Sequence, residues 1–168
     1  MNDDTARLLL DVAERLERSI RARDAPAIVA LNGHRALVLS DYDYLRDEAT
    51  AMSFERRAAA QAREIAAQRW VLAVPQVWLM RSGVVSTRAV SNHPLRAGEE
   101  EAITWMSFDA NDGVDYGRIR FTRGPDGSPA FEGPEIFTVQ AQVRPAAGMP
   151  GYTLLRTLMG DDSDPLKR

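Results

Sequence analysis

Residues 58–80 read AAAQAREIAAQRWVLAVPQVWLM, and the spacing of the apolar side chains changes within this stretch. Up to Gln68 the apolar residues recur every three or four positions, as in an amphipathic helix. From Trp70 to Met80 they occupy both alternating sets of positions, which is typical of a strand that is covered on each side. The change near Trp70 predicts helices before this point and mostly antiparallel strands after it.

The part of the chain before Trp70 contains several start and stop signals for helices. Apolar spacings of three and four predict a first helix over residues 5–23. Asp24 as an N-cap and Asn32-Gly33 as a stop predict a short second helix between them. The run 34–39 fits a strand or a continued helix, and we favour a strand. A segment that begins with an approximate capping box predicts a long helix over residues 40–68.

The part after Trp70 alternates short apolar runs with turn signals. Asn111-Asp112-Gly113 and Gly124-Pro125-Asp126-Gly127 predict two turns between strands. Pro75 cannot donate a ladder hydrogen bond, so we expect a bulge or an edge at that residue. Strands are expected over residues 70–80, 84–91, 102–108, the segment after Gly113, 137–143 and 152–159.

Length and composition favour a single globular domain of the α+β class. The chain has 168 residues, 45% of them hydrophobic and 27% charged, which suits one domain with a sizeable core. We expect this domain to span residues 1–160 and to be followed by a polar tail over residues 161–168.

Several classes of function are disfavoured by residues that the sequence lacks. With no cysteine, the chain forms no disulfide, zinc–thiolate site or iron–sulfur cluster. With two histidines and no phosphate-binding glycine motif, we expect neither a metal nor another cofactor. A net charge of −3 predicts no nucleic-acid partner. The acidic start and the lack of a long apolar run predict a cytoplasmic protein with no membrane partner.

One cluster contains the side chains best suited to catalysis: Asp41, Tyr42, Asp43 and Tyr44. Two carboxylates beside two phenols are suited to proton transfer, with an aspartate as base and a tyrosine as hydrogen-bond donor. The alternative is structural, because carboxylates in the first turn of a helix favour its dipole and tyrosine rings pack there.

The tryptophans are the second group of candidate site residues. Trp70, Trp78 and Trp105 are expected either to line an apolar ligand cavity or to pack in the core or at an interface. The two-faced apolar run 70–80 also predicts a homodimer, since one sheet with few helices would leave one of its faces uncovered.

The order of elements, together with the segment from Ile20 to Leu31 that contains Arg21-Ala22-Arg23-Asp24-Ala25-Pro26, resembles the NTF2-like superfamily. This superfamily includes ketosteroid isomerases and SnoaL-like cyclases. The resemblance implies a curved, mostly antiparallel sheet that wraps around N-terminal helices, an apolar pocket for a small molecule, and a dimer.

Three functions remain open from the sequence. The first is a domain that binds a small apolar or aromatic ligand in a pocket between helices and sheet. The second is a cofactor-free isomerase, cyclase or dehydratase that uses the cluster 41–44. The third is a small acidic interaction protein, such as an immunity or adaptor protein. An enclosed cavity would favour one of the first two functions, and a filled core would favour the third.

Overall fold

The architecture is that of a computed structural model, which describes residues 1–82, 84–91, 93–137 and 148–160. Its elements, in chain order, are α1 (Asp3–Arg21), β1 (Ala27–Asn32), β2 (Ala36–Asp41), α2 (Glu48–Glu64), β3 (Arg69–Arg81), β4 (Val84–Ala89), β5 (Glu99–Asp109), β6 (Gly113–Arg123), β7 (Pro129–Phe131), β8 (Glu135–Ile136) and α3 (Tyr152–Leu158). Most of the expected strand 137–143 and the expected tail 161–168 lie outside the described residues.

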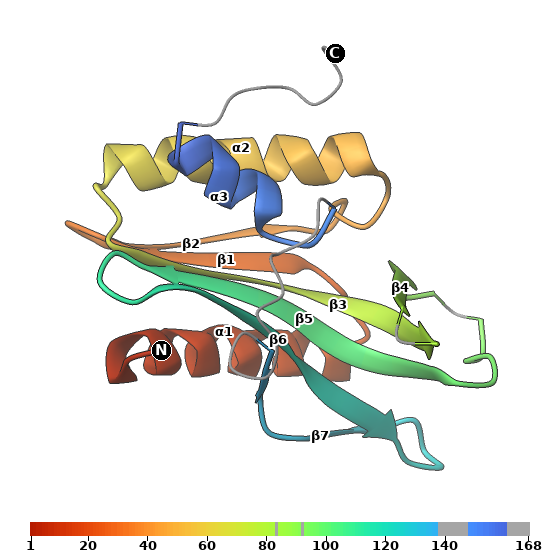
Figure 1. Ribbon diagram of the computed structural model, residues 1–168. Coiled ribbons are helices and arrows are strands. Elements are labelled where there is room, and N and C mark those ends of the chain that lie inside the picture. The colour runs from red at the N-terminus through yellow and green to blue at the C-terminus, as the bar shows by residue number, and fades with distance from the viewer. Residues whose placement is uncertain (83, 92, 138–147, 161–168) are drawn as a thin grey trace.

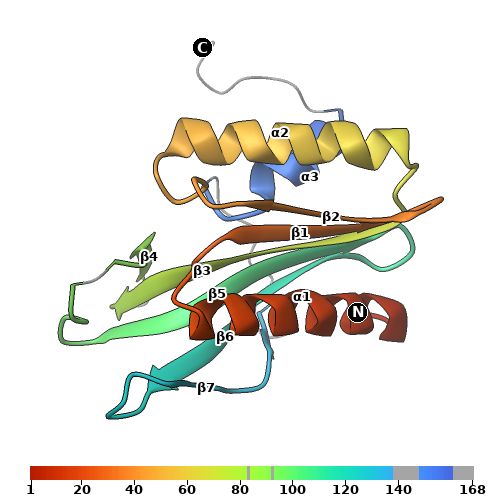
Figure 2. The same ribbon diagram turned by 180° about the vertical axis from the view of Figure 1, so that it is seen from behind.

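One curved antiparallel sheet runs through the molecule, with the strand order β2-β1-β3-β5-β6-β7. β4 pairs with β3, and β8 pairs with β6. Helices α2 and α3 lie over one face of this sheet, and α1 lies over the other (Figure 1). The view from behind shows the same three layers (Figure 2). The predicted class, an α+β fold with helices packed on a curved sheet, is confirmed.

β3 is the central strand, and its two edges are used differently. One edge pairs with β5 over Arg69–Leu79. The opposite edge pairs with β1 up to Ala73 and with β4 from Gln76 onward. Pro75 therefore has no partner strand on that side, so a missing N–H is tolerated there. The expectation of a local edge at this proline is confirmed.

Two hydrophobic cores lie on opposite faces of the sheet. On one face α1 packs Val12 and Leu16, both fully buried, against a cluster that includes Ile103 and Trp105. On the other face α2 and α3 cover a cluster that includes Trp70. Helices of the same chain thus cover both faces of the first half of β3. An uncovered face no longer argues for a homodimer, which remains a prediction.

The first predicted helix is confirmed as α1, but the long helix begins later than residue 40. β2 continues to Asp41, whose Oδ1 accepts a hydrogen bond from the Asp43 backbone N–H (2.7 Å) and so helps to turn the chain. The N-cap of α2 is Asp47, which accepts from the Thr50 N–H (2.7 Å). The N-cap of this helix was therefore predicted seven residues too early, at residue 40 instead of 47.

Two other predicted elements are wrong in type. The segment 24–33 is not a helix but contains β1, which pairs with β2 and β3 on its two edges. Its apolar side chains are buried because they lie alternately in the core under α2 and in the core under α1. The segment 152–159 is not a strand but contains α3, which follows Gly151 in the left-handed region (φ 91°). The run 34–39 is a strand as expected, in β2.

Both predicted turns are confirmed between paired strands. Gly113, with φ 80°, follows the tight connection between β5 and β6. Gly127, also with φ 80°, donates to the Gly124 carbonyl oxygen (2.9 Å) in the connection to β7. A positive φ costs glycine little, which explains the sequence signal at both positions.

None of the described helices is long and apolar enough to cross a bilayer.

Candidate functional site

The four predicted catalytic side chains are not brought together. The Asp41 Oδ2 atom accepts a hydrogen bond from Arg57 Nη2 (2.7 Å), so this carboxylate is bound in an ion pair. Tyr42 is 66% exposed, and Asp43 is also exposed. Tyr44 instead points into the core, where its ring packs edge-on against Phe54. Of these four side chains, Tyr44 alone lines one of the three hollows found between described residues.

Tyr44 belongs to a different buried cluster, whose centre is Glu55 on α2. The Tyr44 hydroxyl donates to Glu55 Oε1 (2.6 Å). The same carboxylate accepts the backbone N–H groups of Gly151 (3.0 Å) and Leu154 (2.8 Å) at the start of α3. Burial raises the pKa of Glu55, although these hydrogen bonds partly oppose the shift. We call this cluster the Glu55 clip, and its contacts join α2 to α3.

The Glu55 clip was missed from the sequence, although α2 contains a signal for it. Glu55 lies on the same helical stripe as Ala58, Ala59 and Ala62, all of them buried. A carboxylate on a buried alanine stripe needs hydrogen-bond donors nearby. Burial and Glu55 also raise the pKa of Tyr44, so the phenol stays protonated and acts as a donor.

The three tryptophans do not line one cavity. Trp70 stacks on Phe108 under α2 and α3, whereas Trp105 lies in the core under α1, on the opposite face of the sheet. Trp78 is on the same face as Trp70 but farther along β3, where its Nε1 donates to Thr104 Oγ1 (2.8 Å). Packing within the two cores is therefore the observed role of Trp70 and Trp105.

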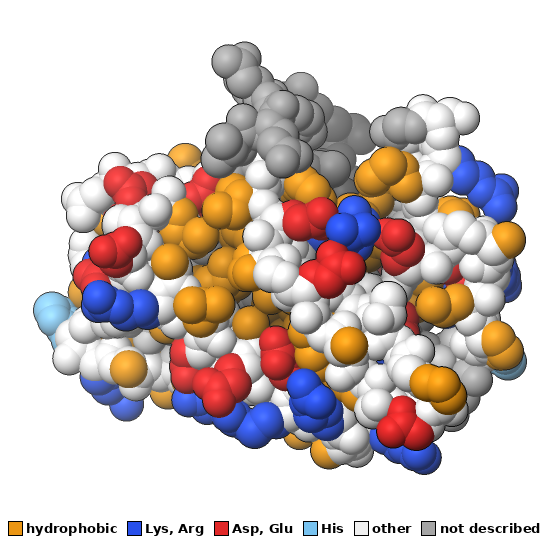
Figure 3. Space-filling view, turned by 90° about the horizontal axis from the view of Figure 1, so that it is seen from below, with side chains coloured by type: hydrophobic (Ala, Val, Ile, Leu, Met, Phe, Trp, Pro, Cys, Tyr) orange, Lys and Arg blue, Asp and Glu red, His pale blue; other side chains and the backbone are white. Residues whose placement is uncertain are grey.

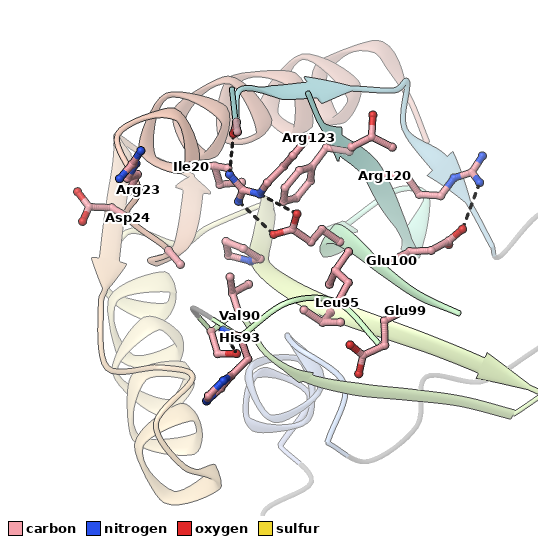
Figure 4. A pocket seen from close by; sticks show the side chains of 18 of the residues that line it. Ile20, Arg23, Asp24, Val90, His93, Leu95, Glu99, Glu100, Arg120 and Arg123 are labelled. Carbon is pink, nitrogen blue, oxygen red and sulfur yellow. Dashed lines mark hydrogen bonds and ion pairs between the residues drawn. The ribbon is translucent and has the colours of Figure 1, made fainter. Parts of the chain in front are cut away.

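A hollow lies at the carboxyl end of α1, and we call it the α1-end pocket (Figure 4). Its volume is about 800 Å³. Buried apolar side chains from three elements form its deepest part: Ile20, Pro75, Val77 and Phe121. Val90 and Leu95, from the connection between β4 and β5, also line it.

Two buried carboxylates line this pocket, and arginines hold both of them. Glu101 accepts two hydrogen bonds from Arg123, at 2.8 Å and 3.0 Å. Glu99 accepts two from Arg88, at 2.9 Å and 2.7 Å, and one from the Arg96 backbone N–H (2.8 Å). These bonds, chiefly those from Arg88, lower the pKa of Glu99 to about 2. Glu99 is therefore ionised at neutral pH and is a weak base.

The charges available to a ligand lie at the rim of the pocket. Arg23, Asp24 and His93 are exposed there, and their side chains form no hydrogen bond or ion pair with another described residue. Figure 3 shows the α1 side of the molecule, where acidic and basic side chains lie close together around hydrophobic ones. The pocket therefore combines an apolar interior with a mixed, partly unpaired rim.

Two smaller hollows lie on the other face of the sheet. One, of about 490 Å³, separates the first half of α2 from β4, and we call it the α2–β4 groove. The other, of about 250 Å³, includes Trp70, Phe108 and Leu158. Trp70 is thus the only one of the three tryptophans to line any of these three hollows.

Within the described ranges, no group of three or more His, Asp or Glu side chains is placed to hold a metal ion.

Comparison with protein-family models, curated proteins and solved structures finds no match for this chain. The resemblance to the NTF2-like superfamily therefore stays a prediction.

Proposed function

We propose that this protein is a binding domain for a small amphipathic molecule and that its site is the α1-end pocket. The supporting observation is the apolar interior of Ile20, Val77 and Phe121 beneath an exposed charged rim. A hollow of about 800 Å³ has the size of a typical small-molecule site. A ligand with an apolar or aromatic body and one polar end would satisfy both parts of the pocket.

Binding without turnover suits the site better than acid–base catalysis. An enzyme of the kind considered from the sequence needs a carboxylate that is shielded from solvent and free to take a proton, which the exposed Asp24 is not. In this pocket the ion pairs Glu99–Arg88 and Glu101–Arg123 occupy the two buried carboxylates. The proposed ligand also differs from the one expected from sequence, because charged groups at the rim favour an amphipathic molecule over a wholly apolar one.

The fluorescent probe 8-anilinonaphthalene-1-sulfonate tests this proposal, because it joins an aromatic body to an anionic group. We expect saturable binding to one site, with the sulfonate near Arg23. Replacing Leu95 with tryptophan should obstruct part of the pocket and weaken binding roughly tenfold, a loss of about 1.4 kcal/mol. Arg23→Gln should weaken binding by a smaller factor, because one exposed charge contributes little.

Met80→Trp is the matched control, since Met80 is also exposed but lies outside the pocket. This variant should bind the probe as the wild type does. Thermal unfolding of each variant shows whether the fold is kept, since this dye also binds partly unfolded chains. Equal binding by folded Leu95→Trp and wild type would contradict the proposed site.

A further inference from the structure

β4 is an edge strand that continues the sheet beyond the end of β1. Its register with β3 runs from Gln76↔Ala89 to Arg81↔Val84, and no described strand pairs with its other edge. In an antiparallel ladder every second residue directs its N–H and C=O away from the partner strand. The outer edge of β4 therefore offers backbone donors and acceptors that another strand can use.

This edge lacks the features by which proteins usually prevent strand addition. Val84, Val85, Ser86 and Thr87 are all exposed, and β4 contains no proline or lysine. Its only charged residue, Arg88, is held by two hydrogen bonds to Glu99. An exposed, uncharged, β-branched edge of this kind is suited to pairing with an extended segment.

The α2–β4 groove lies beside this strand and supplies side-chain contacts. Thr87 and Ala89 of β4 form one wall, and Leu45 and Met52 lie on the opposite wall, beside and within α2. Asp47 and Glu48 also line the groove at the start of α2 and are exposed. Asp47 is paired with Arg46 and caps α2, whereas Glu48 has no ion-pair partner among the described residues. The unpaired negative charge of this wall is therefore that of Glu48.

One side-chain amide that lines the same groove has a hydrogen-bond donor to offer. Gln76, on β3, lines the groove and is only 8% exposed. Its Oε1 accepts a hydrogen bond from Thr104 Oγ1 (2.8 Å), but its amide nitrogen has no hydrogen-bond partner among the described residues. Within the described part of the chain, the side-chain donors that are buried without a partner are Trp70 Nε1, Trp105 Nε1 and Arg120 Nε, and the Gln76 amide is not one of them. This amide is therefore open to the groove, where a peptide carbonyl can accept a hydrogen bond from it.

We propose that the α2–β4 groove binds an extended peptide segment of a partner protein, which adds to β4 as a further strand. Alternate side chains of the segment enter the groove between Thr87 and Met52. A basic side chain of the segment lies against Glu48, which selects lysine or arginine over acidic residues. This site is on the opposite face of the sheet from the α1-end pocket, and the ion pair between Arg88 of the groove and Glu99 of the pocket connects the two.

Two synthetic peptides test the proposal: acetyl-Val-Lys-Val-Lys-Val-Lys-amide and its counterpart with glutamate at each lysine position. In ¹⁵N–¹H NMR titrations of the full chain, the lysine peptide should shift signals of β4 and of residues 45–52 in a saturable manner. The glutamate peptide should bind roughly tenfold more weakly or not at all. Shifts confined to other parts of the chain would overturn the proposal.

Charge-reversed variants separate the groove from general electrostatic attraction. Glu48→Lys should weaken binding of the lysine peptide roughly tenfold. Glu64→Lys is the control, because Glu64 lies at the other end of α2, is exposed and does not line the groove. Equal losses in both variants would overturn the proposal, as would β4 signals that change with protein concentration alone, which would indicate a second copy on this edge.

Discussion

Replacing Glu55 with alanine is expected to lower the free energy of unfolding by about 3 kcal/mol. The variant leaves three buried donors without an acceptor: the Tyr44 hydroxyl and the backbone N–H groups of Gly151 and Leu154. Each such loss costs about 1–3 kcal/mol, and partial relaxation around α3 reduces the total. Chemical denaturation at neutral pH measures the effect, with Glu64→Ala as an exposed control on the same helix.

The pH dependence gives a sharper test of the Glu55 clip, because burial raises the folded-state pKa of Glu55 above 4.5. The folded state then holds this proton to higher pH than the unfolded state. The contribution of Glu55 is therefore complete below about pH 4.5 and falls as pH rises through its folded-state pKa. Glu55→Gln cannot titrate, so the stability of the wild type relative to this variant should fall over that range.

A stability difference between wild type and Glu55→Gln that stays constant with pH would contradict this account. Tyr44→Phe provides a related check, because it removes a donor that lowers the pKa of Glu55. The decline in stability should then extend to higher pH in this variant.

Local sequence patterns were sufficient to predict those elements whose buried residues repeat with a single, regular spacing. α1 was predicted closely because its buried residues, including Val12 and Leu16, repeat at helical spacing. The two glycine turns were found for a similar reason, since Gly113 and Gly127 need positive φ angles that glycine adopts at low cost. In both cases the signal lies within a few residues of the structure that it specifies.

Elements whose burial depends on distant partners could not be identified in this way. Residues 27–31 are continuously apolar, a pattern shared by central strands and buried helices, and only pairing with β2 and β3 decides between them. The aromatic and β-branched residues of 152–159 favour a strand, but Gly151 and the carboxylate of Glu55 support the first turn of α3. That carboxylate is 96 residues away from Gly151.

The residues of the candidate site could not be predicted from local patterns either. Nearby positions in the chain made 41–44 look like one cluster, yet the turn after β2 leaves Tyr42 in solvent and buries Tyr44. The α1-end pocket combines Ile20, Val77 and Phe121 from three elements that are far apart in the sequence. No local motif marks such a pocket, because only the order of strands in the sheet brings its walls together.

Asp109→Ala is expected to lower the free energy of unfolding by about 2 kcal/mol, because this carboxylate fixes the start of α1 to the sheet. The Thr5 hydroxyl donates to Asp109 Oδ2 (3.1 Å), as does Arg69 Nε (3.0 Å). The Asn111 backbone N–H donates to Oδ1 (2.9 Å). Asp11→Ala, which removes an exposed ion pair within α1, is the control and should change stability by less than about 0.5 kcal/mol.

Asp109 should affect the pH dependence in the opposite sense to Glu55. Burial alone would raise the pKa of Asp109, but hydrogen bonds from Asn111, Arg69 and Thr5 outweigh it and hold the pKa below the ordinary 3.8. The unfolded state therefore takes up this proton first as pH falls, and the stabilisation present above about pH 4 is lost in stronger acid. Acid unfolding monitored by circular dichroism should show a shallower decline for Asp109→Asn than for the wild type. Parallel acid curves for the two proteins would mean that this carboxylate does not link α1 to the sheet through its charge.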